Sequence, residues 1–221
     1  MVLALDHADY YFYTGINVQK EKIVKKEIAF FDFDGTITTK DTLLEFIKFS
    51  KGRNLFILGF LLNSVYLVAY KLKIISNQSA KEKILSFFFN GTPVETFKEY
   101  CDAFSKNVLP QLIRPKAVQE IKRLQQQNTV VVVVSASPEN WIEQWAYKNQ
   151  VRLIASLLQI KDGKLTGKIL GKNCHGDEKV SRIQKAFDLS EYNIVAAYGD
   201  SEGDKPMLQL ATNAYYKPFT S

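Results

Sequence analysis

The sequence predicts an α/β protein with a parallel sheet, an inserted helical segment and a small β-hairpin. Three observations predict this fold class. Short, uninterrupted apolar runs, which are typical of strands buried on both faces of a parallel sheet, recur along the chain. Stretches with helical periodicity separate most of these runs. Residues 41–114, in contrast, contain no strand candidate, although strand candidates lie on both sides of them.

The clearest strand candidate is 28–33, an apolar run that includes a carboxylate near its end. Further strand candidates lie at 129–134, 193–198 and, more weakly, 151–154. The helical stretches that separate them lie at 116–127, 138–149 and 177–187. This alternation predicts a layered, Rossmann-like sheet whose parallel strands are joined by right-handed crossovers.

Two local signals refine these elements. Ser137 is a good N-cap and Pro138 is tolerated in a first helical turn, so the next helix is expected to begin there. Within 157–170, Asp162 and Gly163 lie between two short β-like runs. That arrangement is the usual signal of a two-stranded hairpin.

The helical stretch 41–114 is too long to be a loop between neighbouring strands. We therefore expect a small helical cap domain at 41–114, inserted into a core domain formed by 27–40 and 115–221. Residues 1–26 precede the first strand without sustained periodicity, and we expect them to form an N-terminal extension.

Residues 55–70 of the expected cap contain no charged side chain, and Lys51, Arg53, Lys71 and Lys73 flank them. At about 1.5 Å of rise per helical residue the stretch is too short to cross a bilayer. We therefore expect a buried cap helix. The alternative is a helix in peripheral contact with an anionic membrane, since basic residues around an apolar helix suit such an interface.

The composition is that of an ordinary folded protein, with 46% hydrophobic and 24% charged residues. The net charge of +6 is best explained by lysines scattered along the chain on a solvated surface. Attraction to an anionic partner is the alternative. Clustered arginines with interleaved aromatic residues are not conspicuous, so no nucleic-acid partner is expected. Cys101 and Cys174 form no CxxC pair, which argues against a disulfide framework. Because no secretory signal is recognisable, we expect a cytoplasmic protein.

Two carboxylates mark the end of the first strand, in the run Asp32-Phe33-Asp34-Gly35-Thr36. Both can face the crevice beyond the sheet if the chain leaves the strand there, and Gly35 permits a tight exit. One carboxylate can then attack phosphorus while the other handles the proton of the leaving group. An Asx turn or a helix cap is the alternative explanation. The strongly apolar strand before the two aspartates favours a catalytic role for them.

Two further candidates follow later strands. Ser135 comes directly after an apolar run, where a small hydroxyl can donate to a phosphate oxygen, although helix capping is the alternative, above all for Ser137. Lys179 lies in the first turn of a predicted helix, where a cation opposes the helix dipole unless an anion binds there. An exposed lysine is the commoner explanation, so Lys179 is uninformative alone.

An acidic loop follows the strand candidate at 193–198. Asp200, Glu202 and Asp204 lie within it, together with glycines that let the backbone approach a ligand. Hard oxygen ligands of this type suit Mg²⁺. A surface acidic turn is the alternative, but the position straight after a buried strand favours metal binding.

Taken in this order, the four clusters resemble the motifs of the haloacid dehalogenase (HAD) superfamily of aspartate-nucleophile phosphatases. The resemblance covers about residues 28–216 and implies an HAD core with a cap. The helical stretch after the first motif is similar to the cap of the phosphoserine phosphatase-like branch. The run 173–179 is similar to the bacterial hydrolases of subfamily IB within that branch.

The resemblance implies a Mg²⁺-dependent phosphatase that acts on a small phosphorylated substrate. Asp32 would be the nucleophile that forms an aspartyl phosphate, and Asp34 the general acid and base. Mg²⁺ would be held by the carboxylates of Asp32 and Asp200 and by the backbone carbonyl of Asp34.

The same resemblance implies the groups that bind the substrate phosphate. Thr36, Ser135 and Lys179 would donate to its oxygens. Asp204 would act indirectly, by orienting Lys179 and metal-bound water.

Two departures from the phosphoserine phosphatase pattern argue against phosphoserine as the substrate. Asp41 stands where these enzymes usually have a glutamate, and Gly203 where they usually have an asparagine. The apolar stretch 55–70 is instead similar to the cap of bacterial phosphatidylglycerophosphate phosphatases of this branch. A lipid-phosphate phosphatase at the membrane surface and a family phosphotransferase are therefore alternatives. A dehalogenase or a non-catalytic binding protein fits less well, because Asp32, Asp34 and the acidic loop are all retained.

Overall fold

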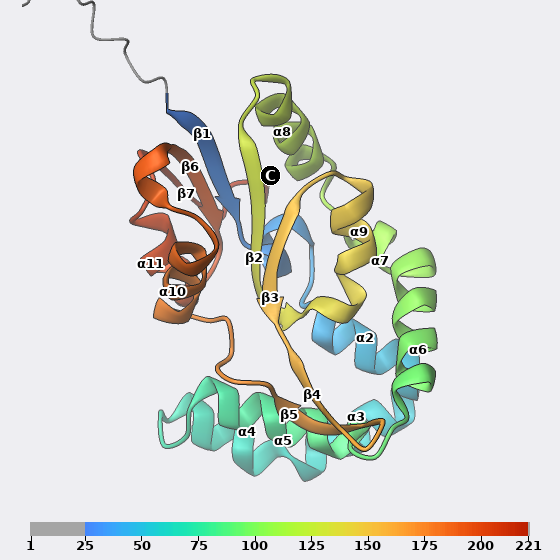
Figure 1. Ribbon diagram of the computed structural model, residues 1–221. Helices are drawn as coiled ribbons and strands as arrows, with labels where there is room; N and C mark the ends of the chain where they lie inside the picture. Colours follow the sequence, from blue (N-terminus) through green and yellow to red (C-terminus); the bar gives the residue numbers. More distant parts are fainter. Residues whose placement is uncertain (1–24, 221) are drawn as a thin grey trace, which may run out of the picture.

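A parallel sheet forms the centre of the computed structural model, which describes residues 25–220 (Figure 1). Its five strands follow the order β3-β2-β1-β6-β7, and all of their pairings are parallel. The strands are β1 (Lys26–Phe31), β2 (Val130–Pro138), β3 (Arg152–Ser156), β6 (Tyr192–Gly199) and β7 (Asn213–Tyr216). The predicted α/β fold class is confirmed. The expected N-terminal extension lies, up to residue 24, outside the described residues.

Alternate residues of the central strand face opposite helical layers. The helices that cover the sheet are α8 (Pro115–Gln126), α9 (Glu143–Lys148), α10 (Asp177–Ala186) and α11 (Lys205–Leu208). Ala29 and Phe31 pack in one cluster with α8 and α9, whereas Ile28 and Phe30 pack in a second cluster with α10 and α11. All four side chains are fully buried. The uninterrupted apolar run therefore reflects a strand covered on both faces.

Helices occupy the stretch between β1 and β2, as predicted. They are α2 (Thr42–Lys51), α3 (Arg53–Leu62), α4 (Ser64–Lys71), α5 (Asn77–Phe89), α6 (Val94–Asn107) and α7 (Leu109–Leu112). The chain enters and leaves this stretch through two adjacent segments, because the Thr39 N–H donates to Leu112 O and the Arg114 N–H to Ile37 O, both at 2.8 Å. We propose that this double connection separates a cap, 41–114, from the core.

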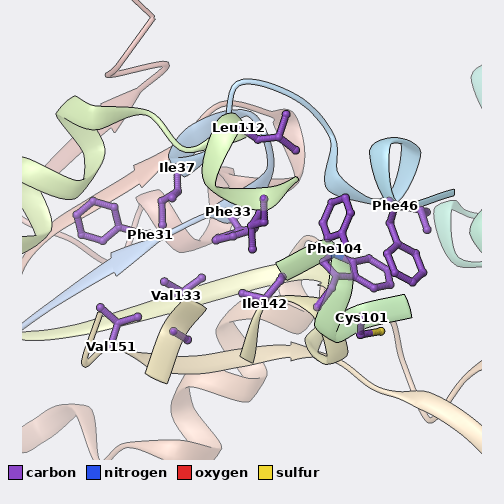
Figure 2. Close-up of a cluster of buried hydrophobic side chains, with 14 of the residues drawn as sticks. Phe31, Phe33, Ile37, Phe46, Cys101, Phe104, Leu112, Val133, Ile142 and Val151 are labelled. Carbon is purple, nitrogen blue, oxygen red and sulfur yellow. The ribbon is translucent and has the colours of Figure 1, made fainter. Parts of the chain in front are cut away.

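One hydrophobic cluster continues from the sheet into the helical stretch (Figure 2). Phe31 and Val133 form its sheet side, and Phe46 of α2 lies beside Phe104 of α6 at its other end. The Phe46 ring stacks on Trp141 with 4.5 Å between centroids and meets the edge of Phe104 at 5.4 Å. This shared core anchors α2 and α6 to the sheet.

The predicted hairpin is confirmed as β4 (Leu158–Lys161) and β5 (Lys164–Ile169). Asp162 and Gly163 form its turn, both with positive φ. The hairpin packs on α5, where Ser86 Oγ donates to the Gly167 carbonyl at 3.2 Å. It therefore supports the helical stretch, although it follows the later part of the chain.

The predicted helix start at Pro138 is wrong. β2 continues to Pro138, which pairs with Ser156 of β3, and a short turn at Glu139–Trp141 precedes α9. Ser137 caps no helix; its N–H donates to Ser135 Oγ at 3.0 Å. Pairing with β3 thus outweighs the local helix signal. The edge strand β7 was missed as well.

The expectation of a buried helix at 55–70 is also wrong. The stretch forms two helices, α3 and α4, with a bend of 58° between them. Asn63 lies at the break, where its side chain donates to the Gly59 carbonyl at 2.8 Å. Gly59 and Asn63 are buried, but most large side chains here are exposed. Among the described helices, none alone has the length and composition of a membrane span, whereas this bent pair has both when taken together.

Candidate active site

The predicted site residues gather where β1, β2 and β6 end, at the edge of the sheet that faces the helical stretch. A cavity of about 440 Å³ opens there. Its lining includes Asp32, Asp34, Lys179, Asp200 and Asp204. These residues come from three separate segments, after β1, in α10 and after β6. The parallel strands bring them together because their carboxyl ends meet at one edge.

Asp32 directly follows the central strand and is buried. Its N–H donates to Tyr198 O at 2.8 Å, which extends the pairing between β1 and β6 by one residue. Its Oδ1 accepts a hydrogen bond from Lys179 Nζ at 2.5 Å. Burial raises the pKa of Asp32 to about 7, although the charge of Lys179 opposes this shift. The carboxylate therefore needs positive charge nearby to stay ionised at neutral pH.

Lys179 is buried, contrary to the exposed lysine that was the commoner explanation. Only 1% of its surface is exposed. Its ammonium donates to Asp32 Oδ1 at 2.5 Å, Asp204 Oδ1 at 2.6 Å and Val134 O at 2.7 Å. Burial alone would lower its pKa, but the two carboxylates outweigh burial and raise the pKa. Three acceptors thus hold a permanently charged ammonium against Asp32.

Asp204 has both of its oxygens occupied. Oδ1 accepts from Lys179, and Oδ2 accepts from the N–H groups of Asp200 and Ser201 and from Ser201 Oγ. Burial raises the pKa of Asp204, but Lys179 and Ser201 hold it below its ordinary value. A carboxylate tied to so many donors suits an orienting role better than metal ligation.

Asp34 is held by the start of α2 and by the end of β2. Its Oδ1 accepts from the Thr42 N–H at 2.7 Å and from Thr42 Oγ1 at 2.6 Å, and its Oδ2 accepts from Ser135 Oγ at 3.2 Å. Trp141 Nε1 donates in turn to Thr42 Oγ1 at 3.0 Å. The carboxyl group is thus fixed beside Asp32 with one face toward the cavity.

The turn after β1 brings the two acidic motifs together. Gly35 has a φ of +79°, and a Cβ at this position would overlap the Asp200 carboxylate. Only glycine combines this backbone conformation with so close an approach. The glycine predicted to permit a tight exit therefore also makes room for Asp200.

Asp32, Asp200 and Asp204 offer oxygens that all lie within 4.8 Å of one another. Burial and the neighbouring carboxylates Asp204 and Asp34 raise the pKa of Asp200. Within the described part of the chain, the Asp200 carboxylate accepts no hydrogen bond, in contrast to Asp204. A hard divalent cation fits between Asp32 and Asp200, because it would offset the repulsion between these two carboxylates and give Asp200 the partner that it lacks.

Two predicted phosphate ligands have different surroundings. Ser135 is fully buried and reaches the site through its hydrogen bond to Asp34. Thr36 is buried too, but its Oγ1 has no hydrogen-bond partner among the described residues, and Thr36 does not line the cavity. Neither residue lines the cavity. Ser135 is connected to the site through Asp34, whereas the Thr36 hydroxyl has no partner among the described residues.

Lys81, which was not predicted as a site residue, reaches the cavity from α5. Its Nζ donates to Ala136 O at 2.9 Å. Burial lowers its pKa, and the carboxylates Asp34 and Asp41 oppose this shift. Asp41 also lines the cavity and caps α2 by accepting from the Leu44 N–H at 3.1 Å. No sequence signal marks Lys81, because a lysine on an amphipathic helix is ordinary.

His175 also lines the cavity. Burial lowers its pKa, and the ammonium groups of Lys179 and Lys81 lower it further. The ring lies against Gly203, where a Cβ would overlap the imidazole. A larger residue at 203 would require the imidazole to move. Gly203, noted in the sequence as a departure, therefore makes room for His175.

The sequence model of the family described as haloacid dehalogenase-like hydrolase matches residues 29–209. Protein CicA of Caulobacter vibrioides is 32% identical over 193 residues, which cover 86% of this chain and 85% of that protein. Probable phosphatase Rv3661 of Mycobacterium tuberculosis is 27% identical over 192 residues, which cover 84% of this chain and 67% of that protein.

Solved structures share the fold. A protein of unknown function from Bordetella pertussis Tohama I superimposes with a TM-score of 0.74 at 21% identity, and the match covers 85% of this chain and 88% of that one. A substrate-bound phosphoserine phosphatase superimposes with a TM-score of 0.58 at 22% identity, over 85% of this chain and 83% of that one. At identities this low, the superposition shows a shared fold and nothing more.

Proposed function

Since the chain belongs to the haloacid dehalogenase-like hydrolase family and is a phosphatase, we propose that it hydrolyses small phosphomonoesters through a covalent phosphate ester on Asp32. One observation carries this proposal. Asp32 lies at the end of the central strand, paired with the buried ammonium of Lys179 and within reach of Asp200. A nucleophile, a fixed cation and room for a metal ion thus meet at one carboxylate.

The first step is attack of an Asp32 oxygen on phosphorus. A bond forms between that oxygen and phosphorus, the bond from phosphorus to the ester oxygen breaks, and Asp34 gives its proton to the departing oxygen. In the second step water attacks the same phosphorus, and Asp34 takes a proton from that water. The Asp32–phosphorus bond then breaks, which releases inorganic phosphate and restores both carboxyl groups.

We propose that Mg²⁺ binds the carboxylates of Asp32 and Asp200 and the backbone carbonyl of Asp34. When bound, it supplies positive charge that offsets repulsion between the anionic nucleophile and the anionic phosphate. The raised pKa of both carboxyl groups supports this assignment. Neighbouring positive charge stabilises their ionised forms.

Lys179 and Ser135 are proposed to donate to the phosphate oxygens on which charge collects. Lys179 already lies against Asp32, and Asp204 keeps its ammonium in place. Thr36 is proposed as a third donor, since its hydroxyl is unpartnered among the described residues. Lys81 adds a second positive charge on the cap side of the cavity, where it attracts an anionic substrate.

The experiment that tests this proposal is the substitution Asp32→Asn, measured by release of inorganic phosphate from p-nitrophenyl phosphate and from serine, sugar and nucleotide monophosphates. The amide keeps the shape of the side chain but loses its nucleophilic charge. We expect turnover to vanish while circular dichroism and thermal unfolding show a folded protein. Asp162→Asn, in the exposed hairpin turn, is the matched control and should keep full activity.

A phosphorylated intermediate can be sought directly. Wild-type enzyme quenched during turnover of a ³²P-labelled substrate should carry label that hydroxylamine removes, as expected of an acyl phosphate. Asp32→Asn should carry none. More than a few per cent of wild-type turnover in folded Asp32→Asn would overturn the assignment of the nucleophile.

A further inference from the structure

We propose that the outer face of α3 and α4 docks the enzyme on an anionic phospholipid surface. The outer face is defined by the exposed apolar side chains between residues 55 and 74. Most of the large hydrophobic side chains that are exposed in the described chain lie there: Leu55, Ile57, Leu58, Leu61, Leu62, Val65, Tyr66, Val68, Tyr70, Leu72 and Ile74. Leu61, Val65 and Ile74 are 67%, 71% and 72% exposed. A contiguous apolar surface of this kind marks a place of interaction.

The opposite face of α3 and α4 is fixed to the protein. Gly59 brings the α3 backbone against the rings of Phe87 and Phe88, so closely that a Cβ would overlap them. The Phe60 and Phe88 rings lie 6.1 Å apart, and Lys83 of α5 lies 4.9 Å from the Tyr66 ring centroid. Because α5 holds one face, only the outer face is free. The two helices therefore suit a position along a lipid surface, as an amphipathic pair, better than a span.

The charges around the outer face identify its partner as anionic. Residues 46–81 contain no Asp or Glu. Arg53 begins α3, Lys71 ends α4 and Lys73 follows it, and all three are exposed. Among the described residues none of the three forms an ion pair with a carboxylate. An apolar surface with basic residues at both ends is complementary to lipid tails and anionic headgroups.

The outer face lies on the same part of the molecule as the opening of the cavity. Ile74 ends the exposed apolar series, and Asn77, at the start of α5, lines the cavity together with Lys81. Figure 1 shows α3, α4 and α5 grouped beyond the carboxyl ends of the strands. A docked enzyme would therefore hold its cavity near the surface, within reach of a phosphomonoester that carries an apolar body. This consequence rests on the proposed phosphatase activity; docking itself does not.

Vesicle binding tests the docking directly. Full-length Asp32→Asn protein, which separates docking from turnover, is sedimented with vesicles of phosphatidylglycerol and phosphatidylcholine and with vesicles of phosphatidylcholine alone. We expect binding to the anionic vesicles at low salt, weaker binding at high salt and little binding to the neutral vesicles. No binding to anionic vesicles at low salt would overturn the proposal.

Matched variants locate the surface. Leu61→Asp should reduce binding by at least about tenfold, whereas Leu170→Asp, at an exposed leucine outside the outer face, should leave it unchanged. The double variant Lys71→Glu with Lys73→Glu should reduce binding to anionic vesicles by at least about 25-fold. Each basic residue lost near an anionic surface accounts for about fivefold. The exposed pair Lys122→Glu with Lys185→Glu makes the same change of net charge elsewhere. Equal losses in both pairs would show net charge alone and contradict the proposal.

Two further measurements separate the remaining outcomes. Size-exclusion chromatography with light scattering shows whether Leu61→Asp breaks a dimer. If the protein forms a dimer that depends on Leu61 and does not bind vesicles, this face would be assigned to a second copy instead.

The activity of the enzyme is then compared on p-nitrophenyl phosphate and on lysophosphatidate in anionic vesicles. Leu61→Asp should lose activity only on the vesicle substrate. If the wild-type enzyme is inactive on both substrates, the proposed phosphatase mechanism is contradicted, while the vesicle-binding result still stands.

Discussion

Lys179 shows how burial decides what a residue does. In the sequence it is one lysine among many, in a helical turn where an exposed side chain is the ordinary outcome. In the structure its ammonium lies between Asp32 and Asp204 with 1% of its surface exposed. A cation so placed would be costly without its partners. The same contacts that stabilise it also set the charge next to the proposed nucleophile.

Asp34→Asn tests the role of Asp34 as general acid and base. Asparagine can still accept from Thr42 through its carbonyl oxygen, so the fold should persist, but it has no proton to give to a leaving oxygen. We expect a loss of about 10²–10⁴ in rate for an alkyl phosphate. The loss should be smaller for p-nitrophenyl phosphate, whose leaving group needs little protonation. Equal losses for both substrates would contradict this role.

His175 should make stability depend on pH. Its pKa in the folded protein lies below the ordinary 6.5, because of burial and the charges of Lys179 and Lys81. The unfolded state therefore binds more protons than the folded state below pH 6.5. The contribution of His175 to the free energy of unfolding is fully present above pH 6.5 and is lost as the pH falls through the folded pKa.

Urea unfolding between pH 7.5 and 5.5 measures this effect. The free energy of unfolding of wild type should fall, relative to that of His175→Gln, as the pH is lowered. Asp32, with a pKa raised to about 7, has the opposite sign in the same range. The difference between the two proteins at each pH is therefore the readout. Parallel curves would contradict the prediction.

At the scale of elements, the β4–β5 hairpin supports the helical stretch rather than the sheet. Its position in the sequence, after β3, places it with the core. Its contacts are nevertheless with α5, because Gly167 lies directly against the backbone of Ser86. The hairpin and α5 thus form one packing unit, and α5 also packs against α3 and α4.

Gly167→Ala tests this packing unit. Gly167 has a φ of +72°, and a Cβ there would overlap Ser86, whereas Gly163 has a φ of +70° with nothing within 4 Å of a Cβ. Gly163→Ala therefore incurs only the cost of a left-handed alanine, about 1–2 kcal/mol. Gly167→Ala should exceed that by about 1–3 kcal/mol from overpacking. Urea unfolding measures both; equal losses would contradict the close approach.

At the scale of the whole molecule, the acidic cluster should couple metal binding to stability. A ligand that binds the folded state alone raises the free energy of unfolding by about 2.7 kcal/mol at 100 times its Kd. Mg²⁺ should therefore raise the melting temperature of wild type and leave that of Asp200→Asn unchanged. Asp162→Asn is the control and should respond like wild type. An equal response in Asp200→Asn would contradict the proposed site.

Activity should follow the same metal. Excess chelator should abolish phosphate release, and Mg²⁺ should restore it. Ca²⁺ should inhibit, since it prefers more ligands and longer bonds and would draw both oxygens of Asp32 onto the metal. Full activity in excess chelator would contradict the assignment of Asp32 and Asp200 as ligands.

Sequence alone determined the parallel sheet and the edge at which the site lies. The apolar run before Asp32 has the pattern of a strand covered on both faces, and the acidic and hydroxyl residues come directly after such runs. Strand ends are local features, and parallel pairing brings them together whatever the details of packing. For that reason the residues at the ends of β1, β2 and β6 could be found without coordinates.

Only the tertiary structure decided the features that depend on distant partners. β2 extends through Pro138 because β3 lies beside it, against the local helix signal of Ser137. Lys81 reaches the cavity because the first turns of α5 lie beside it. The outer face of α3 and α4 is exposed because α5 covers only their opposite face. An apolar segment reveals that it avoids water but not what covers it. That depends on where the rest of the chain packs, and here one side was left free.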